Sequence, residues 1–308
     1  MRFVRSVSRA LAMTIGAWTA WRILGPEVPR RYPAPQVRGL RAPGRTVLVG
    51  EHEFFVREVG PADGKPLVLI HGWSLDSEMT YHTIVPDLAE RYRVVMPDLR
   101  NHGKSDWIRG QYDVVDLADE VAAILDALDM PAAVVMGYSL GGMVAQELTR
   151  RHPHLVGRLV LAATAARPVP TRRPLARVSF WLGRALARVS THEGAALTEG
   201  ALRTSGALRK EHRRWAHEAL MRRDADLFYE AGAAAVRFDS RDWVGRLRVP
   251  VTVVIPTQDI LVPTAAQREL AGLITHADVV ELEGSGHESI LTRGVDYVQL
   301  LEKVMASD

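Results

Sequence analysis

A serine lies in a glycine-rich motif between an apolar segment and a segment of helical composition. Residues 132–136 form a continuous apolar run of strand length, and the motif that follows, GYSLG at 137–141, fits the pattern G-x-S-x-G. Residues 143–151 then have helical composition. A sharp turn between strand and helix would strain the backbone at Ser139 and expose its hydroxyl group as a potential nucleophile.

The motif by itself also fits a simple turn before a helix, because the chain contains 24 glycines. A serine hydroxyl is unreactive at neutral pH unless a base accepts its proton, so nucleophilic chemistry at Ser139 requires a histidine. The chain has 11 histidines, and position must select among them. It has no cysteine, which excludes disulfides, thiolate metal sites and a cysteine nucleophile.

Short apolar segments that alternate with helical segments make up most of the chain after residue 45. This alternation indicates a mostly parallel sheet whose two faces are covered by helices, which is an α/β fold. The expected strands are 46–51, 53–59, 65–70, 93–96, 132–136, 158–163, 249–255 and 278–282, and the expected helices are 79–91, 112–128, 143–151, 264–274 and 289–305.

The alternation is interrupted in residues 167–242, which are rich in Ala, Arg and Leu and show no comparable strand pattern. We expect a helical insertion here, between two parts of one core at 45–166 and 243–308. Helical stretches are expected at 209–222 and 225–236. A further apolar stripe at helical spacing comprises Leu175, Val178, Trp181 or Leu182, Leu186 and Val189.

The segment 1–44 differs in composition from the rest of the chain. Residues 1–24 resemble a signal peptide, with early arginines before an apolar stretch, but no A-x-A cleavage site follows. Their apolar residues have helical spacing, which fits either a helix on a membrane surface or a helix docked on the body or an oligomer partner. Residues 25–44 hold five prolines and indicate an extended linker.

Charge is unevenly distributed along the chain, although the formal net charge is only +3. Residues 1–45 contain nine Arg and one acid, and residues 167–223 contain thirteen Lys or Arg and four acids. These two basic segments therefore sit on an acidic remainder. Each is either a solvated surface or a region attracted to an anionic membrane or an acidic substrate.

Five motifs occur in a fixed order, each at the carboxyl end of an expected strand, where open α/β sheets bind ligands. With them, residues from about 45 to 308 resemble a single-HG α/β-hydrolase, which implies an eight-stranded, mostly parallel sheet and a helical cap inserted after the sixth strand. The motifs are His71-Gly72-Trp73, DLRNHGKS at 98–105, GYSLG at 137–141, QDILVP at 258–263 and GSGH at 284–287.

The resemblance implies a catalytic triad in the order Ser139, Asp259, His287. His287 would be the base that activates Ser139, and Asp259 would orient the imidazole and stabilise its protonated form. The segment before Asp259 departs from the family pattern, because Pro256 stands where glycine is usual. Some relatives carry the acid after the sixth strand instead, but residues 162–170 contain no Asp or Glu.

The resemblance further implies an oxyanion hole formed by the backbone N–H groups of Trp73 and Leu140. Candidate substrate-pocket residues are the side chains of Trp73, Tyr138 and Trp181. His71 is expected to support the Trp73 loop by hydrogen bonding, and the motif at 98–105 is expected to brace the nucleophile loop.

The implied function is hydrolysis of a carboxylic ester, with a lipophilic substrate favoured, through an acyl-enzyme on Ser139 and without metal or cofactor. Alternatives with the same triad are hydrolysis of a C–C bond, thioester or lactone, and perhydrolysis. A non-catalytic α/β-hydrolase-like binding protein is a further alternative. We expect a small-molecule ester or lipid-like partner, no nucleic acid and a cytoplasmic location, with membrane contact through 1–24 or export left open; the oligomeric state is not predicted.

Overall fold

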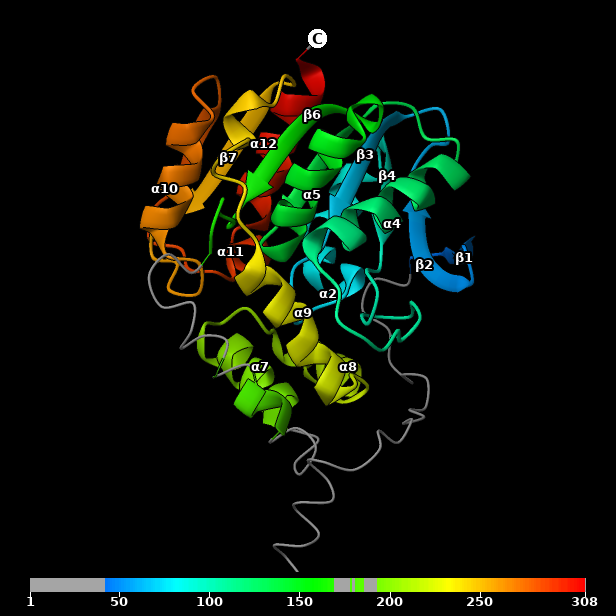
Figure 1. Ribbon diagram of the computed structural model, residues 1–308, viewed down its shortest axis with the longest axis vertical. Helices are drawn as coiled ribbons and strands as arrows, with labels where there is room; N and C mark the ends of the chain where they lie inside the picture. Colours follow the sequence, from blue (N-terminus) through cyan, green and yellow to red (C-terminus); the bar gives the residue numbers. More distant parts are fainter. Residues whose placement is uncertain (1–41, 169–177, 179–180, 186–192, 308) are drawn as a thin grey trace, which may run out of the picture.

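The computed structural model of the protein describes residues 42–168, 178, 181–185 and 193–307. An eight-stranded sheet forms its centre, in the order β1-β2-β4-β3-β5-β6-β7-β8 (Figure 1). The strands are β1 (Gly44–Val49), β2 (His52–Val59), β3 (Lys65–Ile70), β4 (Tyr92–Pro97), β5 (Ala133–Tyr138), β6 (Val156–Ala162), β7 (Val251–Pro256) and β8 (Asp278–Leu282). β1 pairs antiparallel with β2 and β2 antiparallel with β4, whereas β3 to β8 run parallel. This confirms the predicted fold class.

Helices cover both faces of the sheet. The α-helices are α2 (Ser77–Tyr81), α3 (Val85–Leu88), α4 (Val114–Ala127), α5 (Leu140–Arg151), α7 (Glu193–Thr204), α8 (Arg213–Met221), α9 (Ala225–Arg237), α10 (Thr264–Leu273), α11 (Ser289–Thr292) and α12 (Gly294–Ala306). Short 3₁₀ helices are η1 (Pro153–Leu155), η2 (Lys210–His212) and η3 (Val244–Arg246).

The core has two layers, one on each face of the sheet, because side chains along a strand alternate between the two faces. In β3, Val68 and Ile70 belong to the layer beneath α4, α5 and α10, while Leu67 and Leu69 belong to the layer beneath α3 and α12. Successive side chains of a strand point to opposite faces, so an apolar run such as this one fills both layers. The apolar runs of the sequence are thereby explained as central parallel strands buried on two sides.

Two predicted helices are interrupted in the structure. The expected helix 79–91 is replaced by α2 and α3, because Pro86 lies in the first turn of α3 and its ring prevents a continuous helix from passing through it. The expected helix 289–305 is divided into α11 and α12 at Arg293, whose φ of −121° lies outside the helical range. Neither break changes which face of the sheet these segments cover.

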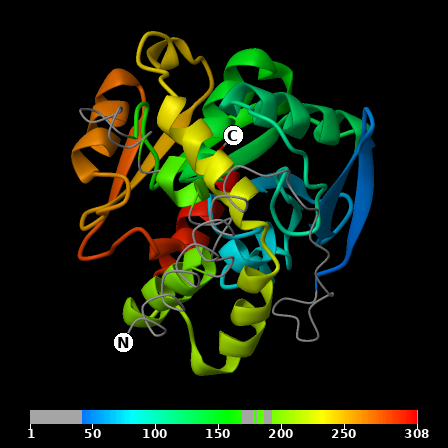
Figure 2. The same ribbon diagram turned by 60° about the horizontal axis from the view of Figure 1, so that its bottom comes forward.

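The helices α7, α8 and α9 lie together beyond the carboxyl ends of the parallel strands (Figures 1 and 2). α7 and α8 share a separate apolar cluster that includes Leu202 of α7 and Trp215 and Leu220 of α8, and Met79 of α2 joins it from the core. Helix α9 instead packs into the main core through Ala231 and Ala234. Helix α7 was not expected from the sequence, since its two glycines weaken its helical pattern. The boundaries of the predicted insertion and its role as a cap stay predictions.

Parts of the predicted organisation fall outside the described residues. These are the segment 1–41 and most of the apolar stripe, of which Val178, Trp181 and Leu182 are described. Within the described part of the chain, no helix is both long enough and apolar enough to cross a membrane.

Candidate active site

Ser139 occupies a strained turn between β5 and α5. Its φ of 56° and ψ of −117° are unusual for a residue with a side chain, and its N–H donates to the Ala162 carbonyl of β6 at 2.9 Å. The flanking glycines are required by close backbone contacts. A Cβ at Gly137 would lie 2.2 Å from the Gly141 carbonyl oxygen, and one at Gly141 would lie 2.0 Å from the Ile70 carbonyl oxygen.

The structure brings Ser139, His287 and Asp259 together from the loops that follow β5, β8 and β7. The Ser139 Oγ lies 3.0 Å from His287 Nε2, and His287 Nδ1 lies 2.8 Å from Asp259 Oδ2. Because an ionised carboxylate only accepts, Nδ1 carries the proton and the Nε2 lone pair faces the serine hydroxyl. This arrangement can remove a proton from Ser139 and retain it on an imidazolium paired with Asp259.

Asp259 is held by a full set of donors. Its Oδ1 accepts from the N–H groups of Leu261 and Val262 at 2.9 and 3.0 Å, and its Oδ2 also accepts from Gln267 Nε2 at 2.8 Å. Pro256 ends β7 without disturbing this turn. The contribution of Gln267 was not anticipated, because it comes from α10 and no local motif signals it.

Tyr138 supports the backbone of the loop that carries His287. Its hydroxyl group donates to the His287 carbonyl oxygen and contacts the Ser289 hydroxyl at 3.0 Å, and its side chain is buried. The structure therefore places Tyr138 behind the His287 loop instead of in a position to line a substrate pocket, in contrast to the prediction. A tyrosine one residue before a nucleophile at a strand end faces the core, as the alternation of the strand requires.

The loop after β3 lies directly against the nucleophile. A Cβ at Gly72 would be 3.1 Å from both the Ser139 Cβ and the Tyr138 carbonyl oxygen, so a larger residue there would press against the nucleophile. Leu140 is the first residue of α5, and its N–H has no acceptor within the helix. The two predicted oxyanion donors, Trp73 and Leu140, thus belong to the two segments that flank Ser139.

His71 determines the direction of the Trp73 N–H group. Its Nδ1–H donates to the Gly72 carbonyl oxygen at 2.8 Å, while its Nε2 accepts from the Leu99 N–H at 3.0 Å. Burial lowers the pKa of His71, which keeps the ring neutral as these two bonds require. In a trans peptide the C=O and the next N–H point in opposite directions, so the Trp73 N–H points away from His71.

The other two predicted pocket residues differ in their surroundings. The Trp73 indole donates from Nε1 to the Phe228 carbonyl oxygen at 2.7 Å and stacks on the Phe228 ring, with centroids 4.5 Å apart. Trp181 is 64% exposed and is not among the residues that line the cavity described below. Its part in substrate binding stays a prediction.

A buried ion pair braces the loops beneath this site. The Asp98 carboxylate accepts from Arg57 at 3.0 Å and from the Ser77 hydroxyl at 2.6 Å, and it also accepts from the Lys104 N–H at 3.0 Å. Burial alone would raise the pKa of Asp98, but the Arg57 guanidinium and these donors hold it below its usual range. The motif at 98–105 thus supports α2 through Ser77 and the His71 ring through the Leu99 N–H, whereas the bracing of the nucleophile loop stays a prediction.

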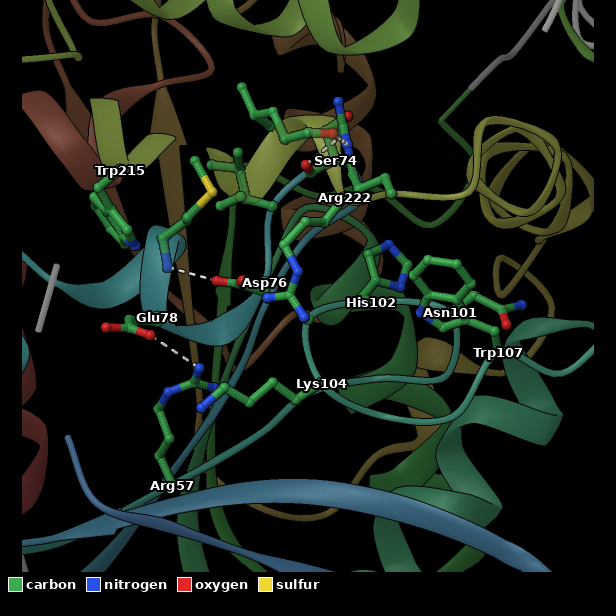
Figure 3. A pocket seen from close by; sticks show the side chains of 16 residues that line it. Arg57, Ser74, Asp76, Glu78, Asn101, His102, Lys104, Trp107, Trp215 and Arg222 are labelled. Carbon is green, nitrogen blue, oxygen red and sulfur yellow. Dashed lines mark hydrogen bonds and ion pairs between the residues drawn. The ribbon is translucent and has the colours of Figure 1, made fainter. Parts of the chain in front are cut away.

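A cavity lies between α2, the loop after β4 and α8 (Figure 3). Ser139, Asp259 and His287 do not line it. Within the described residues, the Arg222 Nε and the His102 Nε2 atoms in its wall have no hydrogen-bond partner. Burial and the neighbouring His71 lower the pKa of His102 to about 3, so its ring is neutral. The charged residues of the wall are Arg57, Lys104, Arg222, Arg223, Asp76 and Glu78.

Metal chemistry has no evident site in the part of the chain that the structure describes. No cluster of three or more His, Cys, Asp or Glu side chains there is arranged to hold a metal ion.

The eight-stranded, mostly parallel sheet with helices on both faces defines the class of this protein as an α/β fold, and comparison with known families agrees. The family model for the alpha/beta hydrolase fold matches residues 65–294, most of the described core. The chain therefore belongs to this family and is a hydrolase, as the sequence motifs predicted.

Individual relatives cover nearly the whole core. The chain is 33% identical over 255 residues to a non-heme chloroperoxidase of Streptomyces lividans, covering 77% of this chain and 90% of that protein. It is also 33% identical over 256 residues to a pimeloyl-[acyl-carrier protein] methyl ester esterase of Aromatoleum aromaticum, covering 78% and 97%. A hydrolase of Pseudomonas aeruginosa has the same fold, with a TM-score of 0.77, 24% identity and coverage of 86% and 98%.

Proposed function

We propose that this protein hydrolyses carboxylic esters through an acyl-enzyme on Ser139. The observation that carries the proposal is the continuous hydrogen-bonded chain Ser139–His287–Asp259, with contacts of 3.0 and 2.8 Å at the carboxyl edge of the sheet. A curated relative with 33% identity is named as a methyl ester esterase, which supports an ester as the substrate. A lipophilic ester, favoured from the sequence, stays part of the proposal.

The proposed reaction starts with attack of the Ser139 Oγ on the ester carbonyl carbon while its proton moves to His287 Nε2. The negative charge on the carbonyl oxygen is stabilised by the backbone N–H groups of Trp73 and Leu140. His287 then gives its proton to the departing alkoxide, and the acyl group remains on Ser139. A water molecule, deprotonated by the same nitrogen, releases the acid and restores the serine. Asp259 stays ionised throughout.

The direct test is turnover of p-nitrophenyl esters with two to sixteen acyl carbons by the wild type and by Ser139→Ala. We expect Ser139→Ala to lower kcat by roughly 10⁵–10⁶-fold, because a triad acts as a unit. The chain-length optimum measures the lipophilic preference. A rate that Ser139→Ala leaves unchanged would refute the proposal. No turnover together with no labelling of Ser139 by a fluorophosphonate would also refute it and would favour a non-catalytic binding protein.

Perhydrolysis is a second candidate, because the relative from Streptomyces lividans is named as a non-heme chloroperoxidase. In this reaction hydrogen peroxide replaces water as the attacking group on the acyl-enzyme. The ester bond to Ser139 breaks, a peracid leaves, and the peroxide proton returns through His287 to the serine. Incubation with acetate and hydrogen peroxide, followed by detection of peracetic acid, distinguishes it; no peracid above the Ser139→Ala background would exclude it.

Other bonds that the same triad can break form the remaining alternatives. C–C bonds, thioesters and lactones each present a carbonyl carbon to Ser139, and geometry at the triad does not select among them. Strong labelling of Ser139 without turnover of any p-nitrophenyl ester would direct attention to these substrates. Compounds of each class can then be ranked by how strongly they slow the labelling of Ser139 by the fluorophosphonate.

A further inference from the structure

Residues of the helical region reach directly to the loop that carries the predicted oxyanion donor. Arg223, between α8 and α9, donates from Nη1 to the Ser74 carbonyl oxygen at 2.6 Å. Close by, the Trp73 indole donates to the Phe228 carbonyl oxygen of α9 at 2.7 Å. Both residues that follow Gly72 are therefore held from outside the core sheet.

Ser74 needs such a restraint because its backbone is strained. Its φ of 81° lies in the left-handed region, which residues other than glycine seldom adopt. A conformation of this kind persists only when its surroundings enforce it. The Arg223 hydrogen bond acts on the Ser74 carbonyl, which is one peptide unit away from Trp73.

Arg223 is itself fixed in place. Its Nε donates to the Leu220 carbonyl oxygen at 3.2 Å, its Nη2 donates to the Thr198 hydroxyl at 3.3 Å, and its guanidinium lies 4.5 Å from the centre of the Phe228 ring. Burial lowers the pKa of Arg223 to about 10, which leaves it protonated at neutral pH. The side chain thus links α7, α8 and α9 to a single carbonyl of the Trp73 loop.

The two ends of this loop are held by different parts of the molecule. On the core side, His71 holds the Gly72 carbonyl, and on the helical side, Arg223 holds the Ser74 carbonyl. The Trp73 N–H lies between these two points. A shift of about 1 Å in a group that contacts the reacting atoms can reduce a rate by roughly 10²-fold, so both restraints matter for catalysis.

We propose that Arg223 is a positioning residue for the oxyanion hole. Through the Ser74 carbonyl it holds the Trp73 N–H in the direction needed to stabilise the transition state, so the hole is complete only when α7, α8 and α9 are seated on the core. This inference rests on the proposed function, because it assigns a part in the same serine chemistry. Because Arg223 acts through the Ser74 carbonyl, the role proposed for it is positioning and not catalytic.

The test compares Arg223→Met, which keeps the length of the side chain but removes every donor, with Arg214→Met, an exposed arginine of the neighbouring α8. Turnover of p-nitrophenyl acetate gives kcat and KM for each variant. The third quantity is the inhibition constant of phenylboronic acid, whose tetrahedral adduct on Ser139 occupies the oxyanion hole. Urea unfolding reports the free energy of unfolding of each variant.

For Arg223→Met we expect kcat to fall by roughly 10- to 100-fold and the inhibition constant to rise in parallel, while KM changes less than about threefold. Arg223→Lys, which keeps one charged donor, should have a kcat between those of Arg223→Met and the wild type. If Arg223→Met does not fold, the same three quantities are measured on Arg223→Lys. Arg214→Met should leave all three quantities unchanged.

The outcomes separate this inference from the proposed function. Unchanged kcat and boronate inhibition in Arg223→Met would overturn the inference and leave the esterase proposal standing. A raised KM with unchanged kcat would also overturn it, since that result indicates substrate binding. A wild type that neither turns over esters nor reacts with a fluorophosphonate at Ser139 would overturn both.

Discussion

The carboxylate of Asp259 is the most completely constrained group in the site. Its two oxygens accept from two backbone N–H groups, from Gln267 and from His287, and its side chain is buried. Every acceptor direction is therefore used, and the carboxylate cannot rotate without losing a partner. This rigidity holds His287 with its Nε2 directed at Ser139.

Asp259→Asn should keep the volume of the side chain and remove its charge. An asparagine amide turned toward His287 would favour the wrong tautomer, so we expect kcat to fall by roughly 10³–10⁴-fold with little change in KM. Gln267→Met is the matched variant, since it removes one donor to the same carboxylate and should lower kcat by only about 3- to 10-fold. Steady-state kinetics on p-nitrophenyl acetate checks both. Near-normal activity of Asp259→Asn would mean that another group orients His287.

Asp76 gives the stability of the protein a pH dependence. Burial and the neighbouring Asp98 raise its pKa to about 6, above the value of about 3.9 expected in the unfolded chain. The native state therefore binds more protons than the unfolded state between these two values, and this group's contribution to stability decreases as the pH rises through them.

Asp76→Asn should remove this pH-dependent loss and retain the helix cap, because Asp76 accepts from the Met79 N–H at 2.7 Å and asparagine caps equally well. We expect the Tm of the variant relative to wild type to increase from about pH 4 to about pH 6 and to level off above about pH 7. Thermal unfolding at matched buffers measures it. A Tm difference that shrinks as the pH rises would contradict the assignment.

At the level of residues, local motifs predicted much of the site. The GYSLG and GSGH motifs placed Ser139 and His287 at strand ends, and the structure brings them to 3.0 Å. The roles of Gln267 and Arg223 were not predicted. Gln267 is only 8 residues from Asp259, but no local motif marks it, and Arg223 reaches Ser74 across a separation of 149 residues. Tyr138 was assigned to the pocket, although the alternation of side chains along β5 directs it into the core.

The junction of β5 and α5 is the element on which the site depends. The helix starts immediately after Ser139, and the strand and the helix approach so closely that neither Gly137 nor Gly141 has room for a Cβ. The neighbouring β3 closes the junction from the other side through the Ile70 carbonyl. The strained nucleophile is thus maintained by the packing of regular elements, together with the hydrogen bond from its N–H to the Ala162 carbonyl.

Gly141→Ala should destabilise the protein by at least about 2 kcal/mol, because the new Cβ meets backbone that cannot move aside. Gly272→Ala in α10 is the control, since a Cβ there meets nothing within 4 Å and should stabilise the helix by about 0.5–1 kcal/mol. Urea unfolding gives both free energies. Equal effects of the same sign in the two variants would contradict the close packing at the junction.

Strands were easier to predict than helices, for a physical reason. A central parallel strand is apolar on both faces, so β3, β5, β6 and β7 stand out as continuous runs. The break between α2 and α3 follows from Pro86. It was missed because the helical spacing of apolar residues continues across this proline. Helix α7 buries only part of one face against α8, so its pattern was too weak to recognise.

In the whole molecule, charged side chains join the helical region to the core. Arg109 lies 3.3 Å from Asp224, the residue that caps α9, and Arg237 at the other end of α9 lies 2.6 Å from Asp113 before α4. These contacts and the Arg223–Ser74 hydrogen bond place α9 across the carboxyl ends of the strands (Figure 2). We propose that the form of the oxyanion hole depends on these helices through Arg223.

The N-terminal segment is best tested separately from this catalytic assembly. Residues 1–41 contain eight arginines and one glutamate, whereas the complete sheet, both core layers and α7 to α9 lie within residues 42–307. We propose that residues 1–24 bring the protein to an anionic lipid surface. A chain of residues 42–308 should therefore keep kcat/KM on p-nitrophenyl acetate within about twofold, because the proposed acyl-enzyme chemistry requires only the core, α7 to α9 and their contacts.

The same truncation should abolish co-sedimentation with phosphatidylserine-containing vesicles, which the full chain is expected to show at low salt. Neutral phosphatidylcholine vesicles are the control, and added salt should weaken binding because a basic helix is attracted to the anionic surface by screened charges. Equal sedimentation of both chains would refute a membrane role for residues 1–24. Loss of ester turnover in the truncated chain would instead indicate that the segment docks on the body, the second arrangement that its apolar periodicity allows.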